Sequence, residues 1–509
     1  FLATADGEWL VVTPEGFFAA SPKGARLVSV SNGLRAFSVD QVYQALYRPE
    51  LVRAKLAGDP DGEVARAAAE LDLGIILGSG PAPITRFSFP REGGTSAEPE
   101  IEVEIELQDE GGGIGRVEWR LNGMTIAVQS RGAEALDSDA PKATTRVALE
   151  PGLNEIEVVA YNAAGLLASV PQKLTVKWDG VASTEPPALY VLAVGVNDYD
   201  DGRLKLKYAA ADAKAVGAAM QKAGAGLFSS VNVITLLDQQ VTEANLDAAF
   251  TDLEAKVKSQ DVFVFFLAGH GKTIEGKYYF IPQDFRFDGD DPIRKGGIDQ
   301  DRWQEWAARV KAKKSVMIYD TCESGSITGS RSVDAAMAQT AAVERLTRAM
   351  GRTILSASTD DAPALEGYQG HGVMTWVLLD AMAEADANGN ATIEVTELAS
   401  YLDVKVPEIS AAAFGLRQVP QMSIKGSDFA LGAMVSVLGA VESFPATLTH
   451  VVAGGTEVMD APEGAKVMAI DAGIFFGVFR IEVKGEWARI AKDGVALGWV
   501  PNSILTPLQ

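Results

Sequence analysis

The fold of the largest part of this 509-residue chain is decided by Val262-Phe263-Val264-Phe265-Phe266-Leu267-Ala268-Gly269-His270-Gly271. Its apolar stretch lacks polar alternation, which is typical of a strand buried on both faces of a parallel sheet. Similar apolar runs lie at 189–196, 315–320 and 353–358, with helical patterns at 209–222, 243–258 and 301–313. Buried strands that alternate with helices predict an α/β sandwich around a mostly parallel sheet.

Two reactive side chains follow these runs. His270 ends the quoted stretch, and Cys322 comes two residues after the run at 315–320. Because the carboxyl ends of parallel strands meet at one edge, we expect the two side chains to lie close together. An imidazole beside a thiol supplies an ion-pair partner and later a proton for a leaving amine. The backbone N–H of Gly271, together with that of Cys322, would then form an oxyanion hole.

The counts of cysteine and histidine exclude other classes of site. The chain has one cysteine and three histidines, so an internal disulfide and a cysteine-based zinc site are both excluded. We interpret His371 and His450 as structural. Taken alone, Cys322 and His270 also have structural interpretations, as a small buried hydrophobe and a satisfied polar group. Their joint placement favours a nucleophile and its base.

The composition limits the partners. The formal net charge of −23 argues against a nucleic acid or an anionic membrane surface as the partner. The simplest interpretation is that this charge keeps the protein soluble. No apolar run reaches the roughly 18 residues of a membrane span. One free thiol leaves the compartment open, with the cytoplasm slightly favoured over the periplasm or secretion. The first residue is Phe1, so we expect a processed or cut chain.

The pattern changes along the chain and predicts four parts. Residues 1–78 begin with short strand-like runs and continue with helical stretches, one of them at 38–56. Residues 79–182 begin with a linker and continue with short strands, among them the alternating run 100–107, which predicts an immunoglobulin-like β-sandwich. The α/β part spans 185–435, and short strands at 438–509 predict a small all-β barrel.

The motifs around the two reactive residues resemble those of the caspase-like cysteine peptidases, in particular metacaspases and paracaspases. The resemblance rests on the stretches Phe266-Leu267-Ala268-Gly269-His270-Gly271 and Tyr319-Asp320-Thr321-Cys322-Glu323-Ser324-Gly325, in which Cys322 stands 52 positions after His270. The resemblance covers about half of the chain. It implies a Cys-His dyad that cleaves peptide bonds through an acyl-enzyme and needs no cofactor.

The resemblance also implies a specificity pocket lined by carboxylates. Asp320 matches the metacaspase pattern before the nucleophile, Asp212 matches a paracaspase segment, and Asp360 falls in a run similar to a metacaspase one. Such a pocket accepts Arg or Lys, so the implied partner is a protein or peptide with a basic residue at the cleavage site. A helix-capping or solvated role is the alternative for Asp212.

Two flanking residues depart from the metacaspase pattern, and two other functions stay open. Thr321 and Glu323 replace the usual Ser and His, and Glu323 would raise the pKa of the thiol through like-charge repulsion. Cleavage after Asp is one alternative function. The other is a non-catalytic caspase-fold scaffold that holds binding parts together.

Two segments are candidate switches. The polar loop at 324–332 contains Arg331, a candidate for self-cleavage if the enzyme cuts after basic residues. The segment 386–397 fills several positions of a calcium loop, but Ala391 stands where glycine is expected and no flanking helices are indicated. The alternative is a helix-capping turn without metal.

The end regions resemble bacterial modules. Residues 438–509, with Trp487 and Gly498-Trp499-Val500-Pro501, are similar to SH3-like domains, which implies a peptide or cell-wall ligand. The first residues resemble segments that join β-propeller repeats to bacterial caspase-like domains. Both would be recognition or tethering parts.

Overall fold

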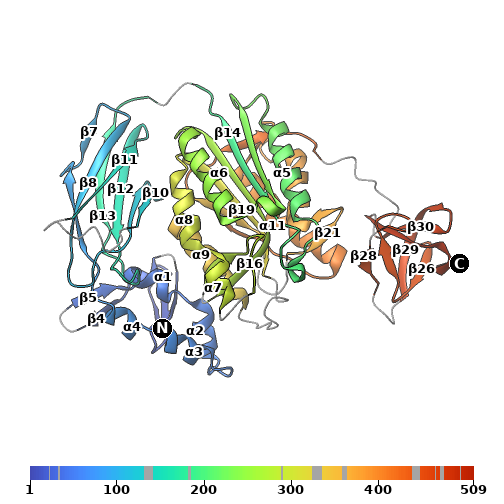
Figure 1. Ribbon diagram of the computed structural model, residues 1–509, viewed down its shortest axis with the longest axis horizontal. Coiled ribbons are helices and arrows are strands. Elements are labelled where there is room, and N and C mark those ends of the chain that lie inside the picture. Colours follow the sequence, from blue (N-terminus) through green and yellow to red (C-terminus); the bar gives the residue numbers. More distant parts are fainter. Residues whose placement is uncertain are drawn as a thin grey trace. The chain divides into compact units, whose positions relative to one another are not determined.

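The computed structural model describes most of the chain, in two compact units. The described residues are 1–21, 23–32, 35–130, 141–181, 185–274, 276–287, 291–323, 335–357, 364–437, 447–464, 466–470, 475–492 and 495–508. For Cys322 and Glu323 only the backbone is described. One unit comprises residues 1–366 with 372–435, and the other comprises 436–509 with 367–371 (Figure 1).

The α/β part is built on a sheet of order β15-β14-β16-β19-β20-β24, with β17 beside β16 and β18 beside β17. The neighbours from β15 to β20 are parallel, and β24 is antiparallel. The mostly parallel sheet predicted from the apolar runs is therefore present. The strands of the main sheet are β14 (Leu189–Gly195), β15 (Val231–Leu237), β16 (Val262–Ile274), β17 (Lys277–Phe280), β18 (Ile298–Asp299), β19 (Lys314–Glu323), β20 (Thr353–Ser356) and β24 (Gln421–Ser423). Two further pairs form separate two-stranded sheets: β21 (Glu366–Tyr368) with β22 (His371–Gly372), and β23 (Thr392–Glu394) with β25 (Ala430–Ala433).

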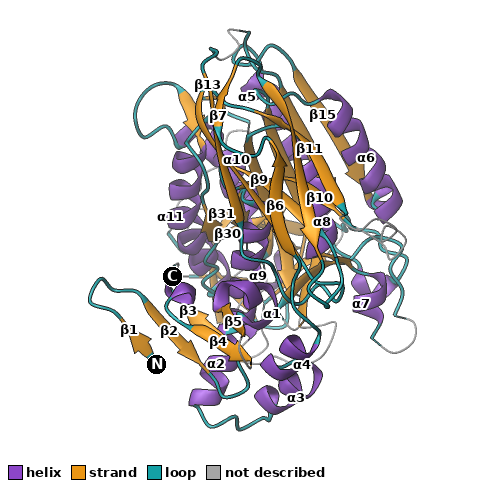
Figure 2. Cartoon of the chain, turned by 90° about the vertical axis from the view of Figure 1, so that its left-hand side faces the viewer, coloured by secondary structure: helices purple, strands orange, loops and turns teal. Residues whose placement is uncertain are grey.

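Helices cover both faces of this sheet (Figures 1 and 2). Leu192 and Val194 of β14 pack into the core shared with α6, α8 and α9, whereas Ala193 between them lies beside Gly217 of α5. Since neighbouring strand residues point to opposite faces, these helices form two layers. The bounds are α5 (Ala209–Gly224), α6 (Glu243–Lys256), α7 (Pro292–Gly296), α8 (Gln300–Arg309), α9 (Ala335–Met350), α10 (Val373–Glu384) and α11 (Val395–Phe414). Within the described residues, no helix is long and apolar enough to cross a membrane.

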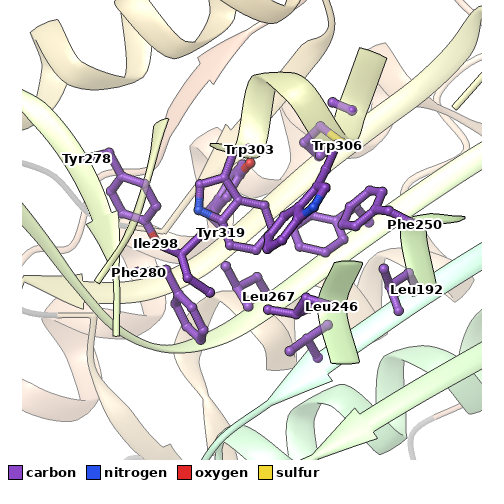
Figure 3. Packing of buried hydrophobic residues seen from close by; sticks show 14 of the residues in the cluster. Leu192, Leu246, Phe250, Leu267, Tyr278, Phe280, Ile298, Trp303, Trp306 and Tyr319 are labelled. Atoms are coloured by element: carbon purple, nitrogen blue, oxygen red, sulfur yellow. The ribbon is translucent and has the colours of Figure 1, made fainter. Parts of the chain in front are cut away.

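An aromatic cluster fills the core between the sheet and α6 and α8 (Figure 3). Trp303 and Trp306 lie three residues apart on α8, so both face the sheet. The Phe250 ring stacks on Trp306 with a centroid distance of 5.4 Å, and the two tryptophans meet edge to face. This packing fixes the helices against the strands that carry the candidate site.

Residues 84–178 form two facing sheets of order β10-β9-β12-β13-β7 and β11-β8-β6. The alternating glutamate run is β8, whose Val103, Ile105 and Leu107 are buried in the shared core with Trp119. The bounds are β6 (Ile84–Phe89), β7 (Gly94–Ser96), β8 (Glu100–Gln108), β9 (Val117–Leu121), β10 (Met124–Gln129), β11 (Lys142–Ala148), β12 (Gly152–Ala160) and β13 (Gln172–Trp178).

The N-terminal segment differs from its prediction between residues 38 and 56. The expected helical stretch is split into a 3₁₀ turn, Val39–Val42, the short helix α1 and the helix α2. Ser38 caps the turn through a capping box with Gln41, and Pro49 begins α2, because proline at the first helical position needs no N–H partner. The bounds are β1 (Leu2–Ala3), β2 (Trp9–Val12), β3 (Phe18–Ala20), β4 (Ser29–Asn32), β5 (Arg35–Ser38), α1 (Tyr43–Leu46), α2 (Pro49–Leu56), α3 (Glu63–Glu70) and α4 (Leu73–Gly78).

The C-terminal unit is all-β. Its antiparallel strands follow the order β28-β27-β31-β30-β29-β26-β32. His450 is buried, and its Nδ1 lies 2.9 Å from the Thr449 hydroxyl. The bounds are β26 (His450–Ala453), β27 (Glu457–Met459), β28 (Lys466–Ala469), β29 (Phe475–Lys484), β30 (Trp487–Lys492), β31 (Val495–Pro501) and β32 (Leu505–Pro507).

Candidate active site

The register of two neighbouring strands brings the predicted nucleophile and base together. β16 and β19 pair in parallel with the Cα of His270 directly opposite that of Cys322. Both residues lie within their strands, because β16 continues to Ile274 and β19 to Glu323, whereas the apolar runs alone placed them just past the strand ends. The backbone therefore sets the two residues side by side on adjacent strands.

The imidazole of His270 is held in one orientation. Its side chain is buried, and Nε2 lies 2.8 Å from the carbonyl oxygen of Leu204. Since a carbonyl oxygen only accepts, Nε2 carries the proton, and Nδ1 is left as the basic nitrogen. Nδ1 is buried and has no hydrogen-bond partner among the described residues. Burial lowers the pKa of His270, and the bond to Leu204 partly offsets this.

Gly271 has a packing reason to be glycine in addition to the predicted oxyanion role. It lies in β16 opposite Phe280 of β17 and Glu323 of β19. A Cβ at this position would stand 2.8 Å from Cε2 of Tyr278 and 3.1 Å from the Thr321 hydroxyl. The Tyr278 hydroxyl donates to that Thr321 oxygen over 3.1 Å, so this pair spans the strands beside the nucleophile.

Two of the predicted pocket aspartates meet at Gly372. Asp212 in the first turn of α5 is 3% exposed, and Asp320 on β19 is 8% exposed. The Gly372 N–H donates to Oδ2 of Asp212 over 3.0 Å. A Cβ on Gly372 would stand 3.0 Å from Oδ2 of Asp320 and 3.2 Å from Oδ2 of Asp212, so both oxygens approach the same point. Thr375 of α10 also donates its hydroxyl to Asp320. Asp212 thus faces inward to this cluster, and the N-cap position of its helix is Tyr208.

A third carboxylate, Glu366, belongs to the same cluster and was missed in the sequence. Burial and the charges of Asp320 and Asp212 raise the pKa of Glu366 to about 7, although a bond from the Lys207 backbone acts in the opposite direction. No local pattern marks Glu366, because its neighbours in the cluster come from α5 and β19, which are far away along the chain. Only the folded chain places it there.

Several predicted residues lie outside what the structure describes. Asp360, the third predicted pocket aspartate, and Arg331, the predicted self-cleavage site, are both in this category, as is the side chain of Cys322. His371 lies in the two-residue strand β22, which precedes α10.

The comparison with protein families bears on the same segment. Residues 189–428 match the family model of the caspase domain. The chain contains a caspase domain. This domain indicates a cysteine peptidase that acts on protein substrates, and it spans the strands of His270 and Cys322 and the carboxylate cluster. The resemblance that the motifs suggested is confirmed at the level of the caspase family.

Solved structures that match parts of the chain share little sequence with it. The Geobacter sulfurreducens protein GSU0716 is 16% identical, with a TM-score of 0.32, over 47% of this chain and 94% of its own. Caspase-1 from Spodoptera frugiperda is 13% identical, with a TM-score of 0.31, over 50% of this chain and 94% of its own. The fibronectin(III)-like modules of Clostridium thermocellum CbhA are 22% identical, with a TM-score of 0.15, over 19% of this chain and 100% of theirs. No curated protein gives a significant match.

The candidate calcium loop of the caspase domain joins two helices, contrary to expectation. α10 ends at Glu384, and α11 begins at Val395, so the segment 386–397 is flanked on both sides. Ala391 has a φ of +63°, the left-handed conformation for which glycine was expected.

Within this loop, side-chain carboxylates accept hydrogen bonds from backbone N–H groups, as a capping turn requires. Asp386 accepts from the backbone N–H groups of Gly389, Asn390 and Ala391 over 2.7–3.1 Å. Glu397 forms a capping box with Glu394 at the start of α11. Within the described ranges, no group of three or more His, Cys, Asp or Glu side chains is arranged to hold a metal ion.

Proposed function

We propose that the caspase domain is a cysteine endopeptidase that cleaves peptide bonds after Arg or Lys. The observation that carries this specificity is the approach of Asp212 and Asp320 to one point at Gly372. Asp320 lies two residues before Cys322 on the same strand, so the cluster is close to the predicted nucleophile. A guanidinium or ammonium placed there would relieve the repulsion between carboxylates that raises the pKa of Glu366.

The register of β16 and β19 supports a Cys-His dyad. In the proposed mechanism, Nδ1 of His270 takes the thiol proton, and the sulfur of Cys322 attacks the carbonyl carbon of the scissile bond. The N–H groups of Gly271 and Cys322 stabilise the oxyanion. The bond to the leaving amine then breaks, and His270 returns the proton to that amine. Water, deprotonated by His270, hydrolyses the thioester and restores the thiol.

The carboxylates argue against cleavage after Asp. An aspartate side chain in the cluster would add another negative charge beside Asp212, Asp320 and Glu366. Besides Asp212 and Asp320, the pocket contains Glu366, which the sequence did not indicate. We propose that Asp360 is a further member of the same pocket.

Fluorogenic peptides that end in Arg, Lys or Asp test this proposal against Cys322→Ala. We expect turnover of the Arg and Lys peptides by the wild type and none by the variant. Asp320→Asn should raise KM for the Arg peptide more than it lowers kcat, because Asp320 holds the substrate side chain. Turnover confined to the Asp peptide would contradict the specificity, and no turnover of any peptide would favour the scaffold alternative.

The other parts are proposed as recognition or tethering modules. The two facing sheets within residues 79–182 support an immunoglobulin-like sandwich, and the antiparallel strands within 438–509 support an SH3-like barrel. Activation by self-cleavage at Arg331 remains a proposal that the intact mass of wild type and Cys322→Ala would test. Identical fragment patterns in the two proteins would exclude it.

A further inference from the structure

The helix α9 is the first described helix after Cys322, and it packs against two parts of the chain at once. Its Ala342, Leu346 and Met350 lie in the aromatic core of the caspase domain. Ala341, one residue along, is buried in the separate core formed by the N-terminal segment. The helix that continues from the nucleophile strand therefore has one side in each core.

Polar contacts reinforce the side that faces the N-terminal segment. Arg348 forms an ion pair with Asp40 over 2.8 Å, and its guanidinium lies 3.9 Å from the ring centre of Tyr43. Glu344 accepts a hydrogen bond from the Tyr47 hydroxyl. Asp40, Tyr43 and Tyr47 all lie within residues 39–56, which comprise the 3₁₀ turn, α1 and α2. We call residues 39–56 the brace.

Arg345 connects the brace to the strand that carries His270. Its side chain is 1% exposed, and its guanidinium donates to two carbonyl oxygens, that of Tyr47 in the brace over 2.9 Å and that of Gly276. Gly276 lies in the turn between β16 and β17. Burial lowers the pKa of Arg345 to about 10, so these acceptors stabilise a charge that burial disfavours.

Gly276 is shaped to receive this guanidinium. Its φ is +73°, and a Cβ would stand 1.8 Å from Nη2 of Arg345. The hairpin that it closes pairs Gly271 with Phe280, and the N–H of Ile281 donates to the carbonyl of His270. A shift of the turn is therefore transmitted along β16 and β17 to His270 and Gly271.

We propose that Arg345 is a positioning residue, through which the docked brace holds the His270 hairpin and the helix after Cys322 in one arrangement. This proposal rests on the proposed peptidase activity. When the brace leaves α9, Arg345 loses the Tyr47 carbonyl and its guanidinium turns to water. The Gly276 carbonyl then loses its buried donor, and the hairpin gains freedom. The N-terminal segment thereby acts in cis on catalysis, apart from any recognition role.

Two substitutions in the full chain test the two ends of this link. Arg348→Gln removes the ion pair and the ring contact with the brace. Gly276→Ala displaces the Arg345 guanidinium at the hairpin. We expect each to lower kcat for an Arg peptide by roughly 5- to 20-fold with KM within about twofold, since the dyad is misplaced and the carboxylate pocket is not. Hydrogen exchange of residues 271–280 should become faster in both variants.

Matched controls separate the link from general destabilisation. Gly415 has a φ of +68° with no atom within 4 Å of its Cβ position, so Gly415→Ala adds similar backbone strain without a clash. Arg302 on α8 makes ion pairs and lies 4.9 Å from the Trp306 ring centre, so Arg302→Gln removes comparable contacts away from the brace. Neither control should change kcat or hairpin exchange.

The outcomes distinguish this proposal from the proposed function. Unchanged kcat and unchanged hairpin exchange in both test variants would overturn it. If the wild type cleaves no peptide, the peptidase proposal fails. Hydrogen exchange of residues 271–280 then decides by itself whether the brace holds the His270 hairpin. If Gly276→Ala does not fold, Arg348→Gln decides, because its side chain is partly exposed and its loss opens no cavity in the core. Arg345→Lys should keep the charge and still show faster hairpin exchange, since an ammonium lacks the two-pronged geometry.

Discussion

At His270, burial and a single carbonyl act in opposite directions on one imidazole. Burial disfavours the imidazolium and lowers the pKa, whereas the carbonyl of Leu204 accepts the Nε2 proton and fixes the tautomer. The result is a neutral ring with Nδ1 as its basic atom. Leu204 carries no sequence signal for this role, because any residue supplies a backbone carbonyl.

The first prediction concerns the titration of His270. Because the chain has only three histidines, their imidazole proton resonances are assignable by substitution, with His270→Gln removing one. We expect the His270 midpoint to lie below its ordinary value of 6.5. The unfolded chain binds this proton more readily, so the free energy of unfolding should decrease as the pH falls below 6.5. A midpoint at or above 6.5 would contradict the buried neutral ring.

Glu366 gives the second prediction, which combines stability with binding. Folding raises the pKa of Glu366 from 4.5 to about 7, so the folded state disfavours the charged carboxylate. The free energy of unfolding should therefore decrease as the pH rises from 4.5 to 7. Glu366→Gln should therefore raise the free energy of unfolding at pH 8 by about 1–3 kcal/mol, with little change near pH 4. The same variant should raise KM for an Arg peptide at pH 8 by about tenfold.

Urea unfolding at both pH values and peptide kinetics measure the two effects. Glu254→Gln, an exposed change on α6, serves as the control and should alter neither. Loss of stability at pH 8 in Glu366→Gln would show that the carboxylate is stabilised in the fold, contrary to this prediction.

The junction of β22 and α10 requires glycine, which has no Cβ, at position 372. At Gly372, a Cβ would come within 3.0 Å of Asp320 and 3.2 Å of Asp212. The third prediction is that Gly372→Ala pushes these carboxylates apart and lowers kcat/KM for Arg peptides by about tenfold or more, with a small loss of stability. Gly78→Ala, where no atom lies within 4 Å, is the control. An unchanged KM for the Arg peptide would separate Gly372 from the pocket.

The loop between α10 and α11 supplies the fourth prediction. Asp386 accepts three backbone N–H groups there, so Asp386→Ala should lower the free energy of unfolding by about 1 kcal/mol. Under the capping interpretation, this loss is the same with calcium and with a chelator. A Tm that calcium raises in the wild type and not in Asp386→Ala would establish the calcium interpretation instead.

On the scale of the whole molecule, an ion cluster joins the sandwich to the caspase domain. Asp301 of α8 contacts Arg116, the residue before β9, over 2.7 Å and Lys277 of β17 over 2.6 Å. Burial would raise the pKa of Asp301, but Arg116 and Lys277 more than offset it and lower the pKa to about 2. The β16–β17 hairpin is thus tied to the sandwich as well as to α9.

The fifth prediction follows from this cluster. Asp301→Asn should lower the free energy of unfolding at pH 7 by about 1 kcal/mol, because it leaves Arg116 and Lys277 with less compensation while solvent screens an aspartate side chain that is 35% exposed. In the wild type, this contribution should be lost as the pH falls from 3.8 toward 2. Urea unfolding followed by tryptophan fluorescence measures both. An equal loss from Asp252→Asn, a half-buried aspartate of α6 away from this cluster, would attribute the effect to net charge.

The sequence predicted the central sheet and the approach of His270 to Cys322 because both depend on local signals. Continuous apolar runs mark the buried strands, and the histidine and the cysteine that follow two of these runs then lie opposite each other through parallel register. Glu366 and Arg345 could not be predicted, since their partners lie on segments far apart along the chain. Pro49, which begins a separate helix inside the N-terminal helical stretch, was a local signal that its helical pattern obscured.

The shared packing of α9 has a consequence for inheritance. A caspase domain that began at residue 185 would leave Ala341 uncovered and Arg345 without the Tyr47 carbonyl. Recombination that exchanged the N-terminal segment for an unrelated one would therefore remove packing and hydrogen bonds from α9 of the caspase domain. We expect the N-terminal segment and the caspase domain to be inherited together. The C-terminal strands belong to a separate compact unit, so we expect their exchange to be tolerated better.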